Sequence, residues 1–546
     1  MARPVRHGAG NASGWLRRIA LCAAMLGAPF ASGAPVTGHL AGAAGAAAQH
    51  IALPAADGDY IEATLDSGAV QVVLDLVATD GRRQRRLLDG ARGSNTVRFV
   101  AATGQQLQLS ARHGSGDYRF EIVRQVPRER QLAPPDTSLS PRVAALARTL
   151  AAGGNTEAFW QAVAAEGTPL VEAVPDARDD SKRIVTFLWR GARHGVRLLG
   201  GPATDHDELQ RLGDSDVWFR SYVVPADTRA SYRLAPDVPS FDGSPRERRV
   251  AILATLQADP LNRHPWPQDA VDAFARESTF ALPAAPVQPG LVPEQGQREV
   301  ATGRLTKWQQ TSKGLGNTRD ITLYRPPGFN PADPATVLLF VFDAPQYLGK
   351  VPTPAILDNL RAAGRLPPVV AVFVDNADNA RGRELPDNPD FARFMAEELL
   401  PRVARETGLK PDARRTVLAG SSYGGLASTS IALRYPQRFG NVLSMSGSYW
   451  WSPDGTPEDQ REYTARRLLK LPKLPLRFFV SAGLFEGPHA YTAAILDTNR
   501  HLRDVLEARG YPVHYREYAG GHDYLVWRGA LADGLLALFG NGKNPR

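Results

Sequence analysis

The sequence predicts a multidomain protein in which two β-sandwich-type domains precede a domain built on a mostly parallel sheet covered by helices. Three stretches carry this prediction. Residues 36–127 alternate apolar and polar side chains at the strand period, with no helical stretch between them. Residues 143–264 place aromatic-rich strands after a helical stretch, and residues 299–546 alternate strand candidates with helical stretches. Such alternation is typical of a parallel sheet with helices on both faces.

The length and composition agree with several domains. At 546 residues the chain exceeds one ordinary core, and its 43% apolar and 22% charged residues are typical of globular proteins. Residues 128–142 and 265–298 are rich in proline, and we expect them to be linkers.

The first 33 residues have the pattern of a secretory signal peptide. Arginines precede an apolar run from Ile19 to Phe30, and small residues follow, with cleavage expected near Gly33. The run is shorter than the roughly 20 residues that a membrane-spanning helix needs. Cys22 lacks the flanking residues expected of a lipid-modified cysteine, so a lipoprotein is the less favoured alternative. We therefore predict a periplasmic protein without stable membrane insertion.

Removal of this segment changes the charge and the cysteine content. It holds four arginines and no acidic residue, so the net charge falls from +8 to +4. No basic run with interleaved aromatic residues indicates nucleic-acid binding. Cys22 is the only cysteine, so we expect the exported chain to have neither a disulfide nor thiol chemistry.

The first β-domain has recognisable strand and turn signals. Residues Val70–Leu76 alternate at period two, Asp80-Gly81 is a turn signal, and Tyr118, Phe120 and Ile122 alternate again. Together with Gly58-Asp-Tyr60 upstream, this order resembles the bacterial pre-peptidase C-terminal type of β-domain. Nothing in it has the arrangement of a catalytic site.

The strongest chemical motif lies in the last domain. The apolar run Val417–Ala419 leads into Gly420-Ser-Ser-Tyr-Gly424, which fits G-x-S-x-G, and a helical stretch follows. Strand, sharp turn and helix are the context in which this pattern forms a nucleophile elbow. Ser422 is the predicted nucleophile, and the backbone N–H of Tyr423 is the first predicted oxyanion donor.

A serine nucleophile needs a base, and His522 is the predicted one. It lies in the glycine-containing loop Ala519–Tyr524, directly after the last strand candidate, Val513–Tyr518. The carboxyl ends of parallel strands meet at one edge of the sheet, where the serine also lies. The other histidines downstream of the serine are less suitably placed; they are His489, His501 and His514.

The remaining parts of the predicted site follow two other strands. Glu486 comes just after the strand at residues 477–481 and is the first choice for the acid that orients the base. Asp497 and Asp523 are weaker alternatives, and a serine–histidine pair without a strong acid stays open. The loop after Val337–Phe342 supplies the second oxyanion donor, the N–H of Asp343 or Ala344.

Residues 155–546 resemble the enterochelin (ferric enterobactin) esterases, in the esterase D group of α/β-hydrolases. Separated motifs of both domains carry the resemblance, in the family's order. They are Phe159-Trp-Gln161, Gly167–Glu172, Val185–Arg190, Asp259–Asn262, Leu315-Gly-Asn317, Glu384-Leu385, Gly420–Gly425, Ser446–Trp451 and Gly520–Asp523. The chain departs from the family in having Asp343-Ala344 where Asp-Gly is usual, and in its signal peptide and first β-domain.

The resemblance implies a serine esterase that hydrolyses the trilactone seryl esters of catecholate siderophores such as enterobactin. It implies a small-molecule ester partner, such as an iron(III)-catecholate siderophore, whose iron belongs to the substrate; the enzyme needs no cofactor or metal. The family's β-domain helps to form the substrate cleft, near Val185–Arg190 and Val217–Tyr222. Side chains suited to an aromatic trianion are Arg190, Arg381, Arg383, Tyr449, Trp450 and Trp451.

Two other functions stay open at this point. The same chemistry serves secreted carboxylesterases and acyltransferases that act on feruloyl, peptidyl or short acyl esters. A non-catalytic ligand-binding protein on a hydrolase scaffold is the alternative from another class, and the serine-to-histidine order argues against it.

Overall fold

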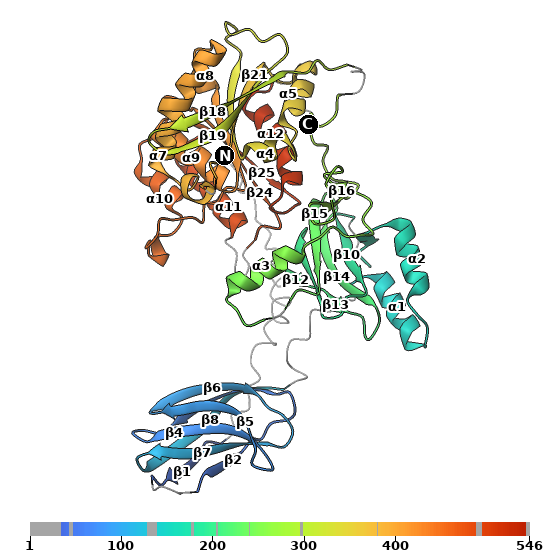
Figure 1. The fold of residues 1–546 in the computed structure, drawn as a ribbon, viewed down its shortest axis with the longest axis vertical. Helices are drawn as coiled ribbons and strands as arrows, with labels where there is room; N and C mark the ends of the chain where they lie inside the picture. The colour runs from blue at the N-terminus through green and yellow to red at the C-terminus, as the bar shows by residue number, and fades with distance from the viewer. Residues whose placement is uncertain are drawn as a thin grey trace, which may run out of the picture. The chain divides into compact units, whose positions relative to one another are not determined.

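The computed structural model describes residues 34–42, 47–127, 139–175, 180–203, 206–239, 241–294, 299–378, 380–487 and 494–541. The predicted signal peptide and residues 128–138 of the first predicted linker lie outside these ranges. The chain divides into two compact units, Met1–Asp136 and Thr137–Arg546 (Figure 1). Within the described ranges, no helix has the length and apolar character needed to cross a bilayer.

The first unit consists of two four-stranded sheets that share one core. Alternate residues of the strands point into it: Val72, Leu74 and Leu76 from one sheet meet Phe120 and Ile122 from the other. One sheet has the order β1 (Val36–Leu40), β8 (Gly116–Val126), β3 (Tyr60–Asp66), β6 (Ser94–Val100). The other has the order β2 (Gln49–Ala52), β7 (Gln105–His113), β4 (Gln71–Ala78), β5 (Arg83–Ala91).

The second unit begins with helices α1 (Pro141–Ala151) and α2 (Glu157–Glu166), followed by two sheets that share a core with Phe187 and Tyr232. The first sheet has the order β13 (Gln210–Arg211), β14 (Val217–Pro225), β10 (Lys182–Arg190), β9 (Leu170–Ala173). The second has the order β12 (Asp207–Glu208), β11 (Val196–Gly200), β15 (Arg229–Pro236), β17 (Glu277–Ala281), β16 (Pro265–Trp266). Helix α3 (Pro245–Thr255) lies between β15 and β16 in the chain.

This domain extends further along the chain than the sequence predicts. The composition predicts a linker over residues 265–298, yet β16 and β17 lie there, and β17 pairs with β15 from Arg229↔Ala281 to Tyr232↔Ser278. The strand pattern at Ser278 and Phe280 is short and flanked by prolines, so composition alone hides it. Pairing with the much earlier strand β15 fixes the segment in the sheet.

The last domain, predicted over residues 299–546, contains an eight-stranded sheet. Its strands β20 to β25 run parallel to one another. Each strand predicted in this domain is present, and an unpredicted edge strand, β18, precedes them. The strand order is β18 (Arg304–Ser312), β19 (Asn317–Arg325), β21 (Val369–Val374), β20 (Val337–Phe342), β22 (Thr416–Ser421), β23 (Asn441–Met445), β24 (Arg477–Gly483), β25 (Val513–Tyr518).

Helices cover both faces of this sheet (Figure 1). Alternate residues of β20 face opposite cores: Leu338, Phe340 and Phe342 one, Val337 and Leu339 the other. The first core is closed by α7 (Pro389–Arg393), the π-helical turn Phe394–Leu399, α8 (Leu400–Thr407), α9 (Tyr423–Arg434), α10 (Tyr463–Lys470) and α11 (Ile495–Ala508). The second core is closed by α4 (Ala344–Leu348), α5 (Thr353–Ala362) and α12 (Tyr524–Phe539).

A buried ion pair joins β19 to the short helix α6 (Arg381–Glu384). The Arg319 guanidinium lies 2.8 Å from Glu384, with the two side chains only 1% and 3% exposed. Asn317 also donates to Glu384, at 2.5 Å, and Arg319 lies over the ring of Phe394. The hydrogen bond from Asn317 therefore links two of the motifs named above, Leu315-Gly-Asn317 and Glu384-Leu385, that are far apart in the sequence.

Removal of one partner is expected to destabilise the fold strongly. In a Glu384→Ala variant, the Arg319 charge stays buried without a counter-ion, so the free energy of unfolding should fall by about 3–5 kcal/mol. Urea unfolding followed by tryptophan fluorescence measures the change. The matched control is Lys307→Ala, which removes the exposed pair with Asp320 and should cost less than about 1 kcal/mol. Equal losses in the two variants would contradict this account.

Candidate active site

Ser422 lies at a sharp turn between β22 and α9. Its backbone has φ 57° and ψ −122°, a left-handed conformation that is strained for a side chain with a Cβ. A Cβ at Gly420 would lie 2.7 Å from the carbonyl carbon of Gly424, so only glycine allows the turn to close. Ser422 is half-buried, whereas the preceding Ser421 is fully buried. This is the geometry of a nucleophile elbow.

The hydroxyl of Ser422 hydrogen-bonds to Ser448, with 3.3 Å between the two oxygens. Among the described residues, the structure shows no hydrogen bond from Ser422 to His522. Hydrogen bonds between nucleophile and base are often long or misaligned without substrate. The same turn is held by backbone bonds from Ser422 N–H to the Met445 carbonyl and from Ser448 N–H to the Ser422 carbonyl.

His522 lies in the loop between β25 and α12, with its side chain 38% exposed. Its Nδ1 lies 2.5 Å from Oε1 of Glu486. An ionised carboxylate can only accept, so Nδ1 carries the proton and Nε2 is left as the basic atom. The imidazole ring also packs edge-on against Trp527, with centroids 4.8 Å apart, which restrains its orientation.

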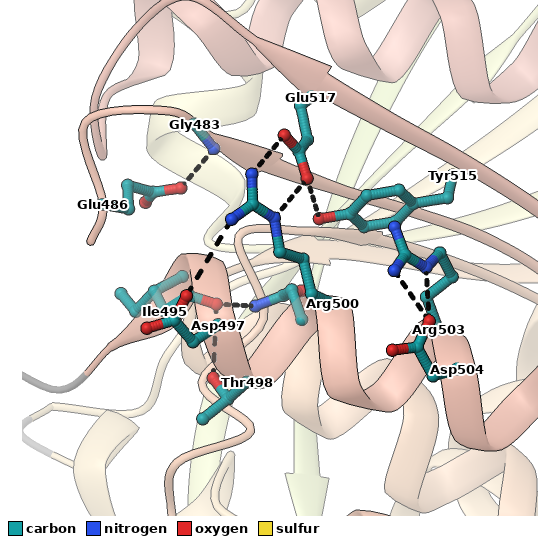
Figure 2. Close-up of polar contacts among 11 residues, drawn as sticks. Gly483, Glu486, Ile495, Asp497, Thr498, Arg500, Arg503, Asp504, Tyr515 and Glu517 are labelled. Atoms are coloured by element: carbon teal, nitrogen blue, oxygen red, sulfur yellow. Dashed lines mark hydrogen bonds and ion pairs between the residues drawn. The ribbon is translucent and has the colours of Figure 1, made fainter. Parts of the chain in front are cut away.

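The second carboxylate oxygen of Glu486, Oε2, also accepts hydrogen bonds. Its side chain is 2% exposed, and Oε2 accepts from Gly483 N–H at 2.5 Å (Figure 2) and from the Ser446 hydroxyl at 2.7 Å. Ser446 in turn accepts from the indole N–H of Trp527 at 3.0 Å. The network fixes the carboxylate in the position where it contacts His522.

The other nearby acidic side chains are engaged elsewhere. Asp497 is half-exposed on α11 and pairs with Arg500 (Figure 2). Arg500 also donates two bonds of 2.7 Å to Glu517 on β25, and these bonds lower the pKa of that carboxyl. Asp523 binds backbone N–H groups. Of the acids considered from the sequence, the structure brings Glu486 to the imidazole.

The loop after β20 lies against the elbow. Asp343 has φ 61° and is buried, and a Cβ added to Gly424 would lie 3.6 Å from its Oδ2. Its carboxylate accepts from Asn376 at 2.8 Å and from Arg381 at 2.7 and 2.9 Å. The left-handed conformation falls on Asp343 and not on Ala344, so the alanine that replaces the family's glycine is accommodated.

Tyr423 and Ala344, the latter one of the two alternatives for the second predicted oxyanion donor (the other, Asp343, precedes α4), share one structural property. Each is the first residue of its helix, α9 or α4, where the backbone N–H has no partner within the helix. The helix N-termini add positive electrostatic potential at that point.

The predicted substrate-binding residues differ in their surroundings. Arg381 is half-buried beside the elbow, over the ring of Tyr423. Arg383 is exposed and Trp450 partly exposed, with the Trp450 ring 6.0 Å from that of Tyr423. Trp451 is partly buried against the core.

The side chains of two other predicted substrate-binding residues, Tyr449 and Arg190, bind neighbouring protein side chains. Tyr449 is only 1% exposed, its hydroxyl bonds to Thr429 and Ser444, and burial raises its pKa to about 12. Arg190 contacts Asp216 and Glu157 within the preceding domain. Burial keeps Tyr449 from contacting a substrate, because proximity in a motif does not determine which side chains are exposed, whereas the role of Arg190, whose side chain is 47% exposed, stays a prediction.

Sequence reasoning missed two residues that support the acid, Ser446 and Trp527. Ser446 directly follows β23 and has φ 48°, so a polar residue at a strand's carboxyl end was the available signal. Trp527 lies in the first turn of α12, and no sequence pattern connects it to Glu486.

Comparison with known proteins assigns the chain to a family. The Esterase family model matches residues 312–538, and the model of the enterochelin esterase N-terminal domain matches residues 184–291. The iron(III) enterobactin esterase of Dickeya dadantii is 37% identical over 435 residues, covering 71% of this chain and 94% of that protein. The iron(III) salmochelin esterase of Escherichia coli is 31% identical, with 73% and 98% covered.

A solved structure agrees. The enterobactin esterase from Shigella flexneri, crystallised in the presence of enterobactin, has a TM-score of 0.55 and 30% identity, covering 70% of this chain and 97% of that one. These matches extend over almost the whole length of the relatives, and the family models match parts of the β-domain and of the catalytic domain. The predicted family is therefore confirmed: the chain belongs to the enterochelin esterases, and its catalytic domain is an α/β-hydrolase.

Proposed function

We propose that this protein hydrolyses the seryl ester bonds of a cyclic tri-catecholate siderophore such as enterobactin, through Ser422, His522 and Glu486. The observation that carries the proposal is the contact of His522 with Glu486 at the strand edge that holds Ser422, in a chain whose relatives are iron(III) enterobactin and salmochelin esterases. The products are linear or monomeric dihydroxybenzoyl-serine fragments, and ring opening aids iron release.

The reaction proceeds in two acyl-transfer steps. Ser422 Oγ turns from Ser448 toward His522, whose Nε2 takes the hydroxyl proton as Oγ attacks the ester carbonyl. The tetrahedral intermediate collapses, the seryl oxygen of the substrate leaves with the proton from Nε2, and an acyl-enzyme remains. Water, deprotonated by His522, then releases the acid and restores Ser422. Glu486 holds the imidazole tautomer and stabilises the imidazolium.

The negative charge on the carbonyl oxygen is met by the N–H groups of Tyr423 and Ala344. A preorganised oxyanion donor of this kind lowers the barrier by about 3 kcal/mol. Arg381 holds Asp343, the residue before Ala344, and so keeps the second donor in place. Its partly exposed guanidinium and the Trp450 ring both lie beside Tyr423, and Arg383 follows two residues later in the chain; this combination suits a trianionic aromatic substrate.

The protein acts in the periplasm. The signal-peptide pattern of residues 1–33 supports export. Edman sequencing of the protein from an osmotic-shock fraction should begin near Ala34, and recovery of the uncleaved chain in the cytoplasm would contradict this location.

A product assay tests the function. The purified protein is incubated with iron-loaded and iron-free trilactone siderophore, with a feruloyl ester and with p-nitrophenyl acetate, and the products are separated by chromatography. Conversion of the trilactone to dihydroxybenzoyl-serine fragments, faster than hydrolysis of the simple esters, is expected. Hydrolysis of the simple esters alone would instead indicate a general carboxylesterase, and no hydrolysis at all would indicate a binding protein.

A further inference from the structure

The loop that carries His522 is hydrogen-bonded to the second β-domain, which contains strands β9 to β17 and is called the β-domain below. Arg229 N–H, at the start of β15, donates to the Ala519 carbonyl at 2.9 Å. Ser231 N–H, two residues later on β15, donates to Oδ2 of Asp523 at 3.0 Å. The β-domain thus contacts the loop on each side of the histidine, through backbone N–H groups that any residue except proline would present at positions 229 and 231.

The two glycines before His522 record the same contact. A Cβ at Gly520 would lie 2.7 Å from the Arg229 carbonyl oxygen, and a Cβ at Gly521 would lie 3.2 Å from the Gly201 carbonyl oxygen. Neither glycine has a positive φ, so close neighbours, and not an unusual backbone conformation, restrict these positions. At Gly520 the neighbours are the β-domain backbone and Val526 of α12, 2.5 Å from the added Cβ, whereas at Gly521 the approach is tight but less severe.

Asp523 joins three parts of the molecule through its two oxygens. Oδ1 accepts from the N–H groups of Leu525 and Val526, at 2.5 and 3.1 Å, and so caps α12. Oδ2 accepts from Ser231 of the β-domain. The first turn of α12 carries Trp527, which packs against the imidazole of His522.

We propose that Asp523 is a positioning residue, and that through its bond to Ser231 the β-domain holds His522 in its catalytic position. The proposal rests on the function proposed above and assigns the β-domain a part in catalysis besides substrate binding. A displacement of about 1 Å in a catalytic group can lower a rate on the order of 100-fold. The bond between Ser231 and Asp523 limits such displacement.

The test is an Asp523→Asn variant of the full chain. Asparagine has one acceptor oxygen, which can keep the cap of α12, while its amide then meets Ser231 N–H donor to donor. Burial raises the pKa of Asp523 to about 6, so the variant loses a charge that the fold disfavours and is expected to fold. We expect kcat to fall about 10- to 100-fold for both p-nitrophenyl acetate and the trilactone, with KM changed less than about twofold and the thermal midpoint nearly unchanged.

Asp237→Asn is the matched control. Asp237 follows the far end of β15 and accepts from two backbone N–H groups, those of Arg193 and His194, within the β-domain. The same chemical change there should leave kcat at the value of the unmodified protein. A Ser231→Pro variant removes the N–H from the other side of the link, and combining it with Asp523→Asn should lower kcat no further than either change alone.

Each outcome decides the proposal. A kcat for Asp523→Asn within twofold of the unmodified protein overturns it, as does full additivity of the Asp523 and Ser231 changes. A rise in KM for the trilactone alone would assign the link to substrate binding instead. If Asp523→Asn does not fold, the kcat of the Ser231→Pro variant decides in its place, by the same criterion. Hydrolysis of p-nitrophenyl acetate also needs His522 as the base. Its rate therefore tests this proposal even if the trilactone is not a substrate.

Discussion

A Ser422→Ala variant is expected to lose about 10⁴- to 10⁶-fold in kcat on aryl esters and on the trilactone, while the protein keeps its fold. Without the hydroxyl no acyl-enzyme forms, and only the oxyanion donors and substrate binding contribute to the rate. We expect the fold to be kept because Ser422 is only half-buried at the elbow, so removal of its hydroxyl leaves no cavity in the core. Initial rates with p-nitrophenyl acetate and a burst experiment with the unmodified protein measure the effect.

The neighbouring serine provides the control for this experiment. Ser421 is fully buried in β22 and cannot reach an ester, so Ser421→Ala should keep most of the activity. If Ser421→Ala abolished hydrolysis and Ser422→Ala did not, the assignment of the nucleophile would be wrong. Mass spectrometry after a fluorophosphonate probe gives an independent check, with the adduct expected on Ser422.

A Glu486→Gln variant is expected to lower kcat by about 10³- to 10⁴-fold with little change in KM. The amide presents N–H to one side of the site. Either it faces the donors Gly483 N–H and Ser446 O–H, or it faces His522 and favours the tautomer protonated on Nε2. That tautomer cannot accept the proton from Ser422, as in other triads whose acid is replaced by its amide.

Asp497→Asn is the control for the acid. Asp497 lies on α11 at the surface, paired with Arg500, so the same loss of charge should leave kcat within about twofold. The ratio of kcat values between the two variants is the measured quantity. A ratio near one would show that the serine and histidine work without Glu486, which is the alternative that the sequence left open.

Central strands of the catalytic domain's sheet, such as β20 and β21, were predictable because they are apolar throughout. In β20 every residue from Val337 to Phe342 is buried, since helices cover both faces, and such a run stands out in any window. Edge strand β18 shows the opposite case. Its residues Arg304–Ser312 are largely exposed and polar, so the pattern does not distinguish it from a loop.

The site was predictable to the extent that chain order determines position at a sheet edge. Ser422, Glu486 and His522 each follow a parallel strand, and parallel strands bring their carboxyl ends together. Their roles stay predictions until the variants are measured. Choosing Glu486 over Asp497 from the sequence rested on the position of Glu486 just after a strand and on the expected position of Asp497 within a surface helix; the structure adds the contact of Glu486 with His522.

By itself the sequence determined the class of fold, the family and the residue types of the site, because periodicity and motif order are local properties of the chain. Only the tertiary structure decided which groups meet. It brought Ser446 and Trp527 to Glu486, placed Tyr449 in the core, and bonded Ser231 to Asp523, 292 residues away. Hydrogen bonds and close packing act over a few ångströms in space, so no local pattern in the chain records contacts between segments so far apart in sequence.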